Sequence, residues 1–459
     1  MLLSLRPGDG LARADNLIPY PSGPRSRPGA VQTFAGAVET AAAWGARVVV
    51  ASGGAVRVLD QSPSTVLSGS VRGLAGTAYQ ALTADAARED RFYVADGVRP
   101  LWYAVRAGTG YLRHEVTNTV LDAAGDPYPV PTSDCIATWR GRLWIGDGYR
   151  VRHSDNDAPA AWDPLNTLAL QGAQPSRVRG LQPLGDRLVV GTEAGLWAIT
   201  GTSQYNWQRD QIVIGRGLVG PRAIASDGAR LWWISAAGLH ELGASVSLSA
   251  GVLDALFEVA DPGAQLEVSP DGELLLMYVR GRLLVMSTRS GDFGEVLAPA
   301  GIYGAVRTDA GIGWYGPAGV WMFGAEDAPD MAIDDEHASV VTVYETHDQY
   351  PNPQGRALCP RLWLTANGSD RGTLRYTSRV DGIEAEPRTL TLADAPAEVL
   401  FRCWDGAVRA ARTAPVQREI AVHRAGTRFV HRLEADCAIE IRTIAPKYQY
   451  GPDPREVQA

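Results

Sequence analysis

Short apolar runs separated by glycine-containing breaks dominate the first three quarters of the chain. In the stretch GDRLVVGTEAGLWAITG, residues 185–201, an apolar run from Leu188 to Val190 is followed by a polar break and by a second run that starts at Gly195. Bulky β-forming residues on both sides of a short turn predict a β-hairpin. We expect Gly195 to occupy a turn position that requires a positive φ angle. Because one hairpin cannot bury this much apolar surface alone, further hairpins are expected beside it.

The same pattern recurs six more times. In each repeat a glycine leads the second apolar run, and these glycines are Gly54, Gly97, Gly148, Gly195, Gly238, Gly281 and Gly319. They are 38 to 51 residues apart, close to the period of a four-stranded propeller blade. A solenoid of helical repeats has a similar period, but the runs here are short, β-branched and aromatic. We therefore predict an all-β fold built on a six- or seven-bladed β-propeller, with each glycine in or beside a turn between adjacent antiparallel strands.

The pattern changes on both sides of the repeats. Residues 1–35 are rich in proline and glycine, which predicts an extended N-terminal strap before a propeller of residues 36–324. The acidic residues 325–339 are interpreted as a linker. Eight short strand-like runs with polar turns then predict a C-terminal β-sandwich-like module over residues 340–447. Residues 448–459 are polar and broken by proline, so we expect an extended or disordered C-terminal arm.

Eight tryptophans fall in or beside the predicted blade strands. Inside a blade such rings fill the wedge between neighbouring sheets, whereas rings exposed on a rim could stack on sugars. Their placement at alternating strand positions favours the first interpretation. They are Trp44, Trp102, Trp144, Trp197, Trp232, Trp233, Trp314 and Trp321.

Composition fits a globular chain with a sizeable core, since 45% of its 459 residues are hydrophobic. The formal net charge of −8 argues against a protein that holds nucleic acid by neutralising phosphates. The N-terminus has only a three-residue apolar start before Arg6, too short for the core of a signal peptide, and no run approaches a membrane span. We therefore expect a soluble protein made in the cytoplasm, without membrane insertion.

The candidate metal ligands do not form a convincing site. In SDNDAPAAW, Asp155 and Asp157 resemble the start of a calcium loop, but residues 158–161 supply no further oxygen ligands, so turn formation is the preferred interpretation. The acidic cluster of residues 330–336, with Asp330, Asp334, Asp335 and Glu336, could also take calcium, but a solvated linker is preferred. The cysteines are widely separated and are interpreted as buried free thiols: Cys135, Cys359, Cys403 and Cys437. We expect neither a metal nor a cofactor.

The sequence contains no recognisable catalytic motif. It has no serine elbow, no phosphate-cradling glycine loop and no HExxH, and its histidines are scattered: His114, His153, His240, His337, His347, His423 and His431. We therefore expect a protein that is not an enzyme. A propeller enzyme is the alternative, because propellers carry catalytic groups on loops from different blades. Polar residues converging on one deep axial pocket would favour that alternative.

Two stretches resemble the tail nozzle (tail tubular protein B) family of short-tailed bacteriophages. The stretch NLIPYPSGPRSRPG resembles the family's N-terminal signature at Asn16, Pro19, Gly23, Arg27, Pro28 and Gly29. The region from Cys135 to the hairpin described above is similar to two further runs of the family. The matching residues are Gly141, Arg142, Leu143, Ser154, Asp155, Trp162, Pro164, Leu184, Gly185, Asp186, Arg187, Leu188, Trp197, Thr200 and Gly201. The chain has no sequence block that matches the family's platform or tip insertions.

The resemblance implies a structural protein of the virion tail. It implies a homo-oligomeric ring, a hexamer, that extends the portal channel, lets genome DNA pass without specific binding, and contacts phage adaptor and tail fibre proteins. With a net charge of −8, we expect a channel lined by Asp, Glu and small polar side chains. A glycan-binding tail tip is a further possibility, and it would place exposed, coplanar tryptophans on one rim.

Overall fold

The computed structural model describes residues 11–450 apart from short gaps. The gaps are residues 16, 21–22, 27–29, 61–63, 70, 72–73, 84–86, 171–175, 204, 250–253, 258, 292, 299–300, 310, 324–329, 332–336, 339–341, 347–356, 369–372, 392–399, 403–407, 411–415 and 436–438. The chain forms two compact units. The propeller unit consists of Gln32–Leu283 and Ala298–Met322, and the sandwich unit of Met1–Val31, Leu284–Leu297 and Phe323–Ala459.

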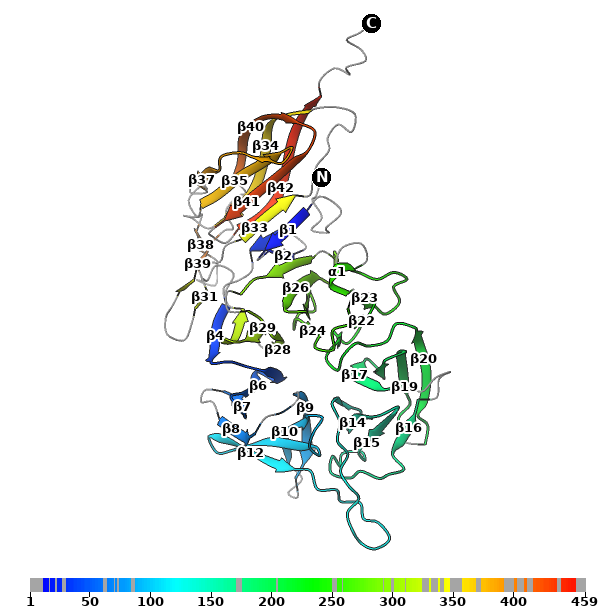
Figure 1. Ribbon diagram of the computed structural model, residues 1–459. Coiled ribbons are helices and arrows are strands. Elements are labelled where there is room, and N and C mark those ends of the chain that lie inside the picture. Colours follow the sequence, from blue (N-terminus) through cyan, green and yellow to red (C-terminus); the bar gives the residue numbers. More distant parts are fainter. Residues whose placement is uncertain are drawn as a thin grey trace. The chain divides into compact units, whose positions relative to one another are not determined.

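Seven antiparallel sheets, the blades, follow one another along the described residues 30–323 (Figure 1). The first four blades have four strands each, in sequential order. Blade 1 contains β5 (Thr40–Trp44), β6 (Arg47–Ser52), β7 (Ala55–Leu59) and β8 (Ser64–Ser68), and blade 2 contains β9 (Ala75–Leu82), β10 (Arg88–Ala95), β11 (Trp102–Ala107) and β12 (Gly110–Glu115). Blade 3 contains β13 (Ile136–Trp139), β14 (Arg142–Asp147), β15 (Arg150–His153) and β16 (Thr167–Ala169), and blade 4 contains β17 (Val178–Leu184), β18 (Arg187–Thr192), β19 (Gly195–Thr200) and β20 (Gln208–Ile214).

The last three blades are less regular. Blade 5 has three strands, β21 (Ile224–Ser226), β22 (Leu231–Ser235) and β23 (Gly238–Glu241), and is followed by the short helix α1 (Asp254–Phe257). Blade 6 contains β24 (Gln265–Val268), β25 (Leu274–Val279), β26 (Arg282–Ser287) and β27 (Phe293–Val296), and the unit boundary falls within β26. Blade 7 contains β28 (Gly304–Thr308), β29 (Gly311–Gly316), β30 (Gly319–Phe323) and the early strand β4 (Ala30–Ala35). No helix among the described residues is long and apolar enough to cross a membrane.

Strand β4 closes the ring of blades. It comes from the predicted N-terminal strap, yet it lies beside β30 as the fourth strand of the last blade. The side-chain amide of Gln32 donates a hydrogen bond to the carbonyl oxygen of Ala318, and the hydroxyl of Thr33 donates to that of Val320 at 3.4 Å. The strap therefore contributes a blade strand, and in the described part of the chain it is the fourth strand of the last blade.

The seven leading glycines confirm the repeat assignment. Each lies between, or at the start of, the second and third strands of one blade, and their number settles the blade count at seven. Gly54 and Gly148 have φ angles of 70° and 61°. The expectation for Gly195 was wrong in its reason, because its φ is not in the positive range. A Cβ atom there would lie 2.1 Å from the carbonyl oxygen of Val213 on β20, so glycine is needed for the close approach of two strands.

Apolar side chains pack between neighbouring blades. One cluster joins Trp44 of blade 1 to Phe92 and Trp102 of blade 2, and another joins Val48 of blade 1 to Val306 of blade 7. Seven of the eight tryptophans named above are at most 7% exposed, which confirms their interpretation as core residues. Trp321 is half-buried and stacks on Trp314 with ring centroids 6.2 Å apart.

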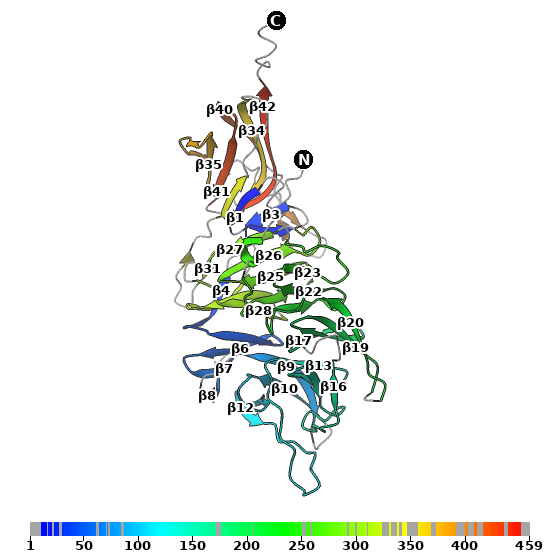
Figure 2. The same ribbon diagram turned by 45° about the vertical axis from the view of Figure 1, so that its right-hand side comes forward.

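The sandwich unit contains two sheets, which are antiparallel apart from the pair of β1 and β27 (Figure 2). One has the order β1 (Leu11–Asp15), β33 (Thr342–Thr346), β41 (Phe429–Ala435), β35 (Thr373–Val380) and β36 (Ile383–Glu384), with β37 (Arg388–Thr391) also on β35 and with β27 parallel to β1. The other has the order β2 (Leu17–Tyr20), β3 (Gly23–Ser26), β42 (Ile439–Tyr450), β34 (Ala357–Gly368) and β40 (Val416–Gly426). β31 (Asp330–Met331) pairs with β32 (His337–Ala338) and, in parallel, with β4. β38 (Leu400–Arg402) and β39 (Val408–Ala410) form a separate pair.

The two sheets pack face to face, as the sequence predicts. Leu362 and Leu364 of β34 share one buried cluster with Tyr376 of β35 and Phe429 of β41. Pro360 interrupts β34 at a point where its register with β40 shifts, which is where a central strand tolerates proline. Each of the eight strand-like runs after residue 340 corresponds to a strand in the structure.

The unit boundaries differ from the predicted ones because the chain passes between the units four times. The segments Met1–Val31 and Leu284–Leu297 belong with the C-terminal strands, since β1 pairs with both β27 and β33. The predicted acidic linker contains the strand pair β31 and β32, and its other residues lie outside the described part of the chain. Of the predicted C-terminal arm, residues 448–450 extend β42, and residues 451–459 are not described.

Candidate functional site

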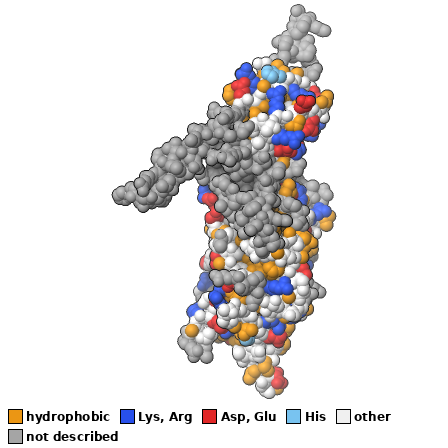
Figure 3. All heavy atoms as spheres, turned by 90° about the vertical axis from the view of Figure 1, so that its left-hand side faces the viewer, with side chains coloured by type: hydrophobic (Ala, Val, Ile, Leu, Met, Phe, Trp, Pro, Cys, Tyr) orange, Lys and Arg blue, Asp and Glu red, His pale blue; other side chains and the backbone are white. Residues whose placement is uncertain are grey.

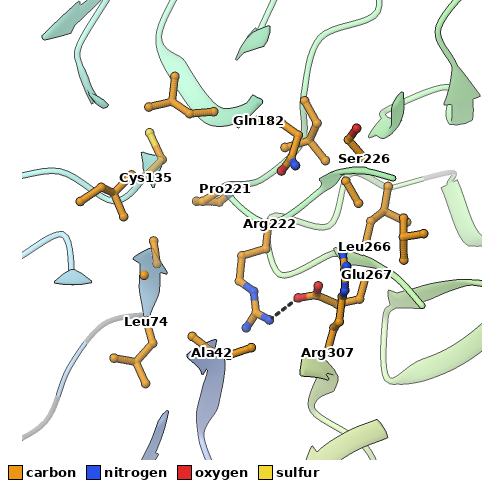
Figure 4. Close-up of a pocket in the computed structure, with 18 of the residues that line it drawn as sticks. Ala42, Leu74, Cys135, Gln182, Pro221, Arg222, Ser226, Leu266, Glu267 and Arg307 are labelled. Carbon is orange, nitrogen blue, oxygen red and sulfur yellow. Dashed lines mark hydrogen bonds and ion pairs between the residues drawn. The ribbon is translucent and has the colours of Figure 1, made fainter. Parts of the chain in front are cut away.

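The propeller unit has an axial pocket of about 310 Å³ (Figure 4). The innermost strand of every blade contributes to its wall: β5, β9, β13, β17, β21, β24 and β28. Small residues such as Ala42, Ala75 and Ala225 make up much of this wall, because seven strands converge here. At Gly76 a Cβ atom would lie 2.0 Å from the ring of Phe92, so this position excludes larger residues. The pocket is the place where side chains from distant parts of the sequence meet.

Arg222 extends across the axial pocket and contacts three other blades. It lies just before β21 of blade 5, and its guanidinium donates hydrogen bonds to the carbonyl oxygens of Ala41 in blade 1, at 2.6 Å, and Ala305 in blade 7, at 3.1 Å. It also donates to the hydroxyl of Tyr315 at 3.2 Å and to Glu267 of blade 6 at 3.0 Å. A planar guanidinium with several fixed donors suits such a junction. We call Arg222 and Glu267 the axial brace.

The brace is a partly buried ion pair. The side chains of Arg222 and Glu267 are 19% and 25% exposed. Burial alone would lower the pKa of Arg222, but Tyr315 and Glu267 outweigh it, so the pKa is raised and the guanidinium stays charged. Burial raises the pKa of the Glu267 carboxyl, and the nearby Arg222 and Arg307 only partly offset this. The charged form of Arg222 is therefore stabilised by Glu267 and Tyr315, and that of Glu267 by Arg222 and Arg307.

In the described part of the wall, no hydrogen bond joins a hydroxyl or thiol to a carboxylate or a histidine. The hydroxyl oxygen of Ser226 accepts the backbone N–H of Gly228 at 2.9 Å. Cys135 is 2% exposed, and burial raises the pKa of its thiol to about 12, which keeps it protonated. Among the described residues of the wall there is no histidine to act as a base. Polar residues do converge on the axis, but Arg222 and Glu267 bind each other, and Arg222 also binds backbone carbonyl oxygens.

The residues that carry the phage resemblance lie elsewhere. Of the N-terminal signature, Pro19 and Gly23 lie in the hairpin of β2 and β3, and Asn16, Arg27, Pro28 and Gly29 lie outside the described residues. In blade 3, the Arg142 side chain donates to the carbonyl oxygen of Ser154 at 2.9 Å, and the backbone N–H of Leu143 donates to its hydroxyl at 3.1 Å. These contacts tie the start of β14 to the chain after β15.

Trp162 and Asn118 join blades 2 and 3. The backbone N–H of Trp162 donates to the Asn118 side-chain oxygen at 2.9 Å, and the Asn118 amide donates back to the carbonyl oxygen of Trp162 at 2.9 Å. Asp155 accepts a hydrogen bond from the side chain of Asn166. Gly141 has a φ of 67°, and its carbonyl oxygen accepts a hydrogen bond from the hydroxyl of Tyr79 in blade 2 at 2.8 Å. The motif residues of blade 3 therefore hold a junction between blades.

The motif residues of blade 4 shape its turns. Gly185, with a φ of 55°, and Asp186 lie between β17 and β18, followed by Arg187 as the first residue of β18. Trp197 is 7% exposed. At Gly201 a Cβ atom would lie 2.5 Å from the carbonyl oxygen of Asn206, so the turn after β19 needs glycine. None of these residues lines the axial pocket.

Other candidate residues have structural roles in the described part of the chain. Asp157 lies in a turn with a φ of 54°, and no group of acidic, cysteine or histidine side chains among the described residues could hold a metal ion. Cys135 and Cys359 are buried free thiols, as expected, while Cys403 and Cys437 lie outside the described residues. Asp334, Asp335, Glu336 and His347 also lie outside them. The axial brace was missed because its members come from separate blades; the signal available was one acidic residue, Glu267, in the buried strand β24.

Comparisons with known proteins bear on the fold alone. No family model and no curated protein matches the chain. Among solved structures it is similar to PorZ, a bacterial surface component of the type-IX secretion system of Porphyromonas gingivalis. The two are 13% identical, with a TM-score of 0.35, over 69% of this chain and 44% of PorZ, so this chain spans less than half of that protein.

Two further matches are described as a WD40 domain and a propeller. The Neurospora crassa Pan2 WD40 domain is 9% identical, with a TM-score of 0.39, over 63% of this chain and 90% of that domain. The Dos1 propeller is 11% identical, with a TM-score of 0.35, over 61% of this chain and 76% of that chain. At these identities nothing about function follows.

Proposed function

We propose that this chain is a non-enzymatic structural component of a bacteriophage tail, of the tail nozzle kind. The observation that carries the structural role is the axial brace. In a propeller enzyme, reactive groups from several blades would be directed into the axial pocket. Here Arg222 uses its donors on Glu267, Tyr315 and the backbone of two blades. The converging charges thus serve to hold the blades together.

The placement in a tail rests on the resemblance. Gly141, Arg142 and Trp162 take part in the junction of blades 2 and 3, and Gly185 and Gly201 take part in turns of blade 4. Residues that shape a scaffold in this way are expected to match between proteins that share that scaffold. The resemblance therefore supports a common architecture with the nozzle family.

The proposed assembly is a homo-oligomeric ring, a hexamer, in the virion tail. The ring extends the portal channel, genome DNA passes through it, and adaptor and tail fibre proteins are its neighbours. The net charge of −8 on each copy suits a lumen that does not grip phosphates.

Electron microscopy tests this proposal directly. Negative-stain images of the purified protein are expected to show closed rings with an axial opening, and gold-labelled antibodies are expected to bind virions at the tail. A protein that stays monomeric at every concentration would contradict the ring. Virions that contain none of the protein would contradict the tail assignment.

A further inference from the structure

The connection between β12 and β13 forms a finger, residues 118–130, which projects from the blades (Figures 1 and 2). Its two arms are joined by backbone hydrogen bonds, from Tyr128 N–H to the oxygen of Val120 at 3.0 Å and from Asp122 N–H to the oxygen of Asp126 at 2.8 Å. The Asp122 carboxylate accepts the N–H of Ala124 at 2.8 Å and that of Asp126 at 3.0 Å. These bonds give the tip a defined shape.

The base of the finger is fixed to the propeller. Asn118 is 3% exposed and makes the reciprocal hydrogen bonds to Trp162 described above. The backbone N–H of Thr119 donates to the carbonyl oxygen of Ala160 at 3.0 Å. A protrusion that is ordered before it meets a partner loses little conformational entropy on binding.

The tip of the finger is apolar and acidic. Leu121 is 54% exposed, and Pro127 beside it is also exposed. Asp122 and Asp126 add negative charge, and no Lys or Arg occurs between residues 113 and 140. Hydrophobic and acidic side chains mark this end in the space-filling view (Figure 3). Negative charge disfavours nucleic acid and anionic membranes as partners, so the tip suits a protein surface that is apolar and basic.

The propeller unit itself carries an apolar surface with one exposed cation, here called the outer patch: Leu165, Tyr205 and Arg209. Leu165 precedes β16 in blade 3 and is 87% exposed, and Tyr205 precedes β20 in blade 4 and is 90% exposed. The exposed Arg209 of β20 donates a hydrogen bond to the carbonyl oxygen of Ala169 in β16, which joins the two outer strands. Leu165 and Tyr205 thus each precede one of two outer strands that this hydrogen bond joins.

Hydrogen bonds also hold the described residues around Tyr205. The side-chain oxygen of Asn206 accepts the backbone N–H groups of Thr202 and Ser203 at 2.9 and 2.8 Å. Leu165 and Tyr205 expose most of their apolar surface, which burial against a partner would remove from water. The outer patch therefore presents two exposed apolar side chains and one cation, held by these hydrogen bonds.

We propose that the finger of one copy docks on the outer patch of a second copy of this chain. Leu121 packs against Leu165 and Tyr205, and the acidic tip faces Arg209. Because the finger and the patch are different surfaces of one propeller unit, the contact is heterologous and repeats head to tail, which gives a ring if the rotation closes. This inference rests on the proposed function, of which ring formation is a part.

The finger tip is too small to hold two copies together alone. Stable protein interfaces bury about 1,200 to 2,000 Å² in total, more than a tip of a few residues supplies. The docking contact is therefore one part of a larger interface, and its loss weakens association without abolishing every contact between copies.

Sedimentation of the full chain over a range of concentrations tests the contact. Leu121→Ser and Tyr205→Ser are each expected to raise the dissociation constant at least tenfold. Leu112→Ser is the matched control, because Leu112 is 53% exposed on β12 and lies outside both surfaces; it is expected to leave association unchanged. An equimolar mixture of the Leu121→Ser and Tyr205→Ser variants is expected to form mixed dimers, since each variant retains one intact surface. Thermal melts of all three variants are expected to match the wild type.

The outcomes separate this inference from the function on which it rests. If the wild type assembles and both variants assemble equally well, the docking contact is wrong while the ring proposal stands. If only one variant is impaired, the pairing of these two surfaces is wrong. If the wild type never associates, both the ring and the docking contact fail.

Discussion

Replacing Arg222 tests whether the axial brace stabilises the propeller unit. In an Arg222→Met variant, four hydrogen bonds across the axis are lost and Glu267 is left in a confined pocket without its partner. Removing one member of a buried ion pair costs on the order of 3 kcal/mol, and the partial exposure of this pair lowers that figure somewhat. The free energy of unfolding, measured in urea, is expected to fall by that amount.

Two further variants control this experiment. Arg222→Met combined with Glu267→Gln is expected to be more stable than Arg222→Met alone, because no uncompensated carboxylate remains. Arg106→Met, at an exposed position on β11, is expected to stay within about 0.5 kcal/mol of the wild type. An Arg222→Met protein as stable as the wild type would show that the brace does not hold the blades.

Buried histidines predict a loss of stability in acid. Nδ1 of His153 lies 2.9 Å from the Ser154 carbonyl oxygen, and its Nε2 accepts the indole N–H of Trp207 at 3.2 Å, an arrangement that requires the neutral ring. Burial lowers its pKa to about 4; the bond to Ser154 and the nearby Asp155 oppose this, and Arg142 adds to it. His240 and His431 are shifted by burial in the same direction, to about 4.

The direction of this pH dependence follows from proton binding. Between pH 6.5 and about 4 the unfolded chain binds protons at these rings and the folded chain does not, so stability falls as the pH falls through this window. The contribution of His153 is at most about 3 kcal/mol. Urea unfolding at a series of pH values is expected to give a shallower pH slope for His153→Gln than for the wild type. Equal slopes would mean that His153 titrates alike in both states.

At the scale of elements, the finger depends on one side chain at its base. Asn118→Ala removes both hydrogen bonds to Trp162 and leaves the buried backbone groups of that residue without their partner. Amide hydrogen exchange in residues 119–130 is expected to become faster, while exchange in β9, β10 and β11 is unchanged. Thr117→Ala, at the exposed neighbouring position, is the control. Unchanged exchange in the finger would show that its own turn suffices to order it.

Many strands and turns of both units could be predicted from local sequence patterns. Gly148 and Gly281 mark turns because their φ angles of 61° and 80° suit glycine, and six of the seven leading glycines have a positive φ. Gly195 is required by the close approach of two strands instead, so glycine occurs there for a different reason. The eight C-terminal runs were predictable because short β-forming segments are bounded by polar turns.

At the scale of the whole molecule, the charge of the chain predicts how it meets DNA. With a net charge of −8, and with the proposed lumen of acidic and small polar side chains, the free protein is expected to show no DNA binding at physiological salt. A gel-shift assay with linear duplex DNA at low and physiological salt measures this. A shift that weakens steeply as salt rises would instead indicate an arginine-lined surface that grips phosphates.

The sequence by itself determined the all-β class, the glycine-led repeat and the strands of the C-terminal module, because turns and strand patterns are local properties of the chain. Only the tertiary structure decided the rest. Arg222 meets Ala41 across 181 positions and Glu267 across 45, and β1 pairs with β33 in the last third of the chain. These pairings depend on how separate strands converge around an axis or within a sheet, and no local pattern encodes which distant residues will face each other. The axial brace, the closing strand β4 and the interleaved units were therefore visible only in the folded chain.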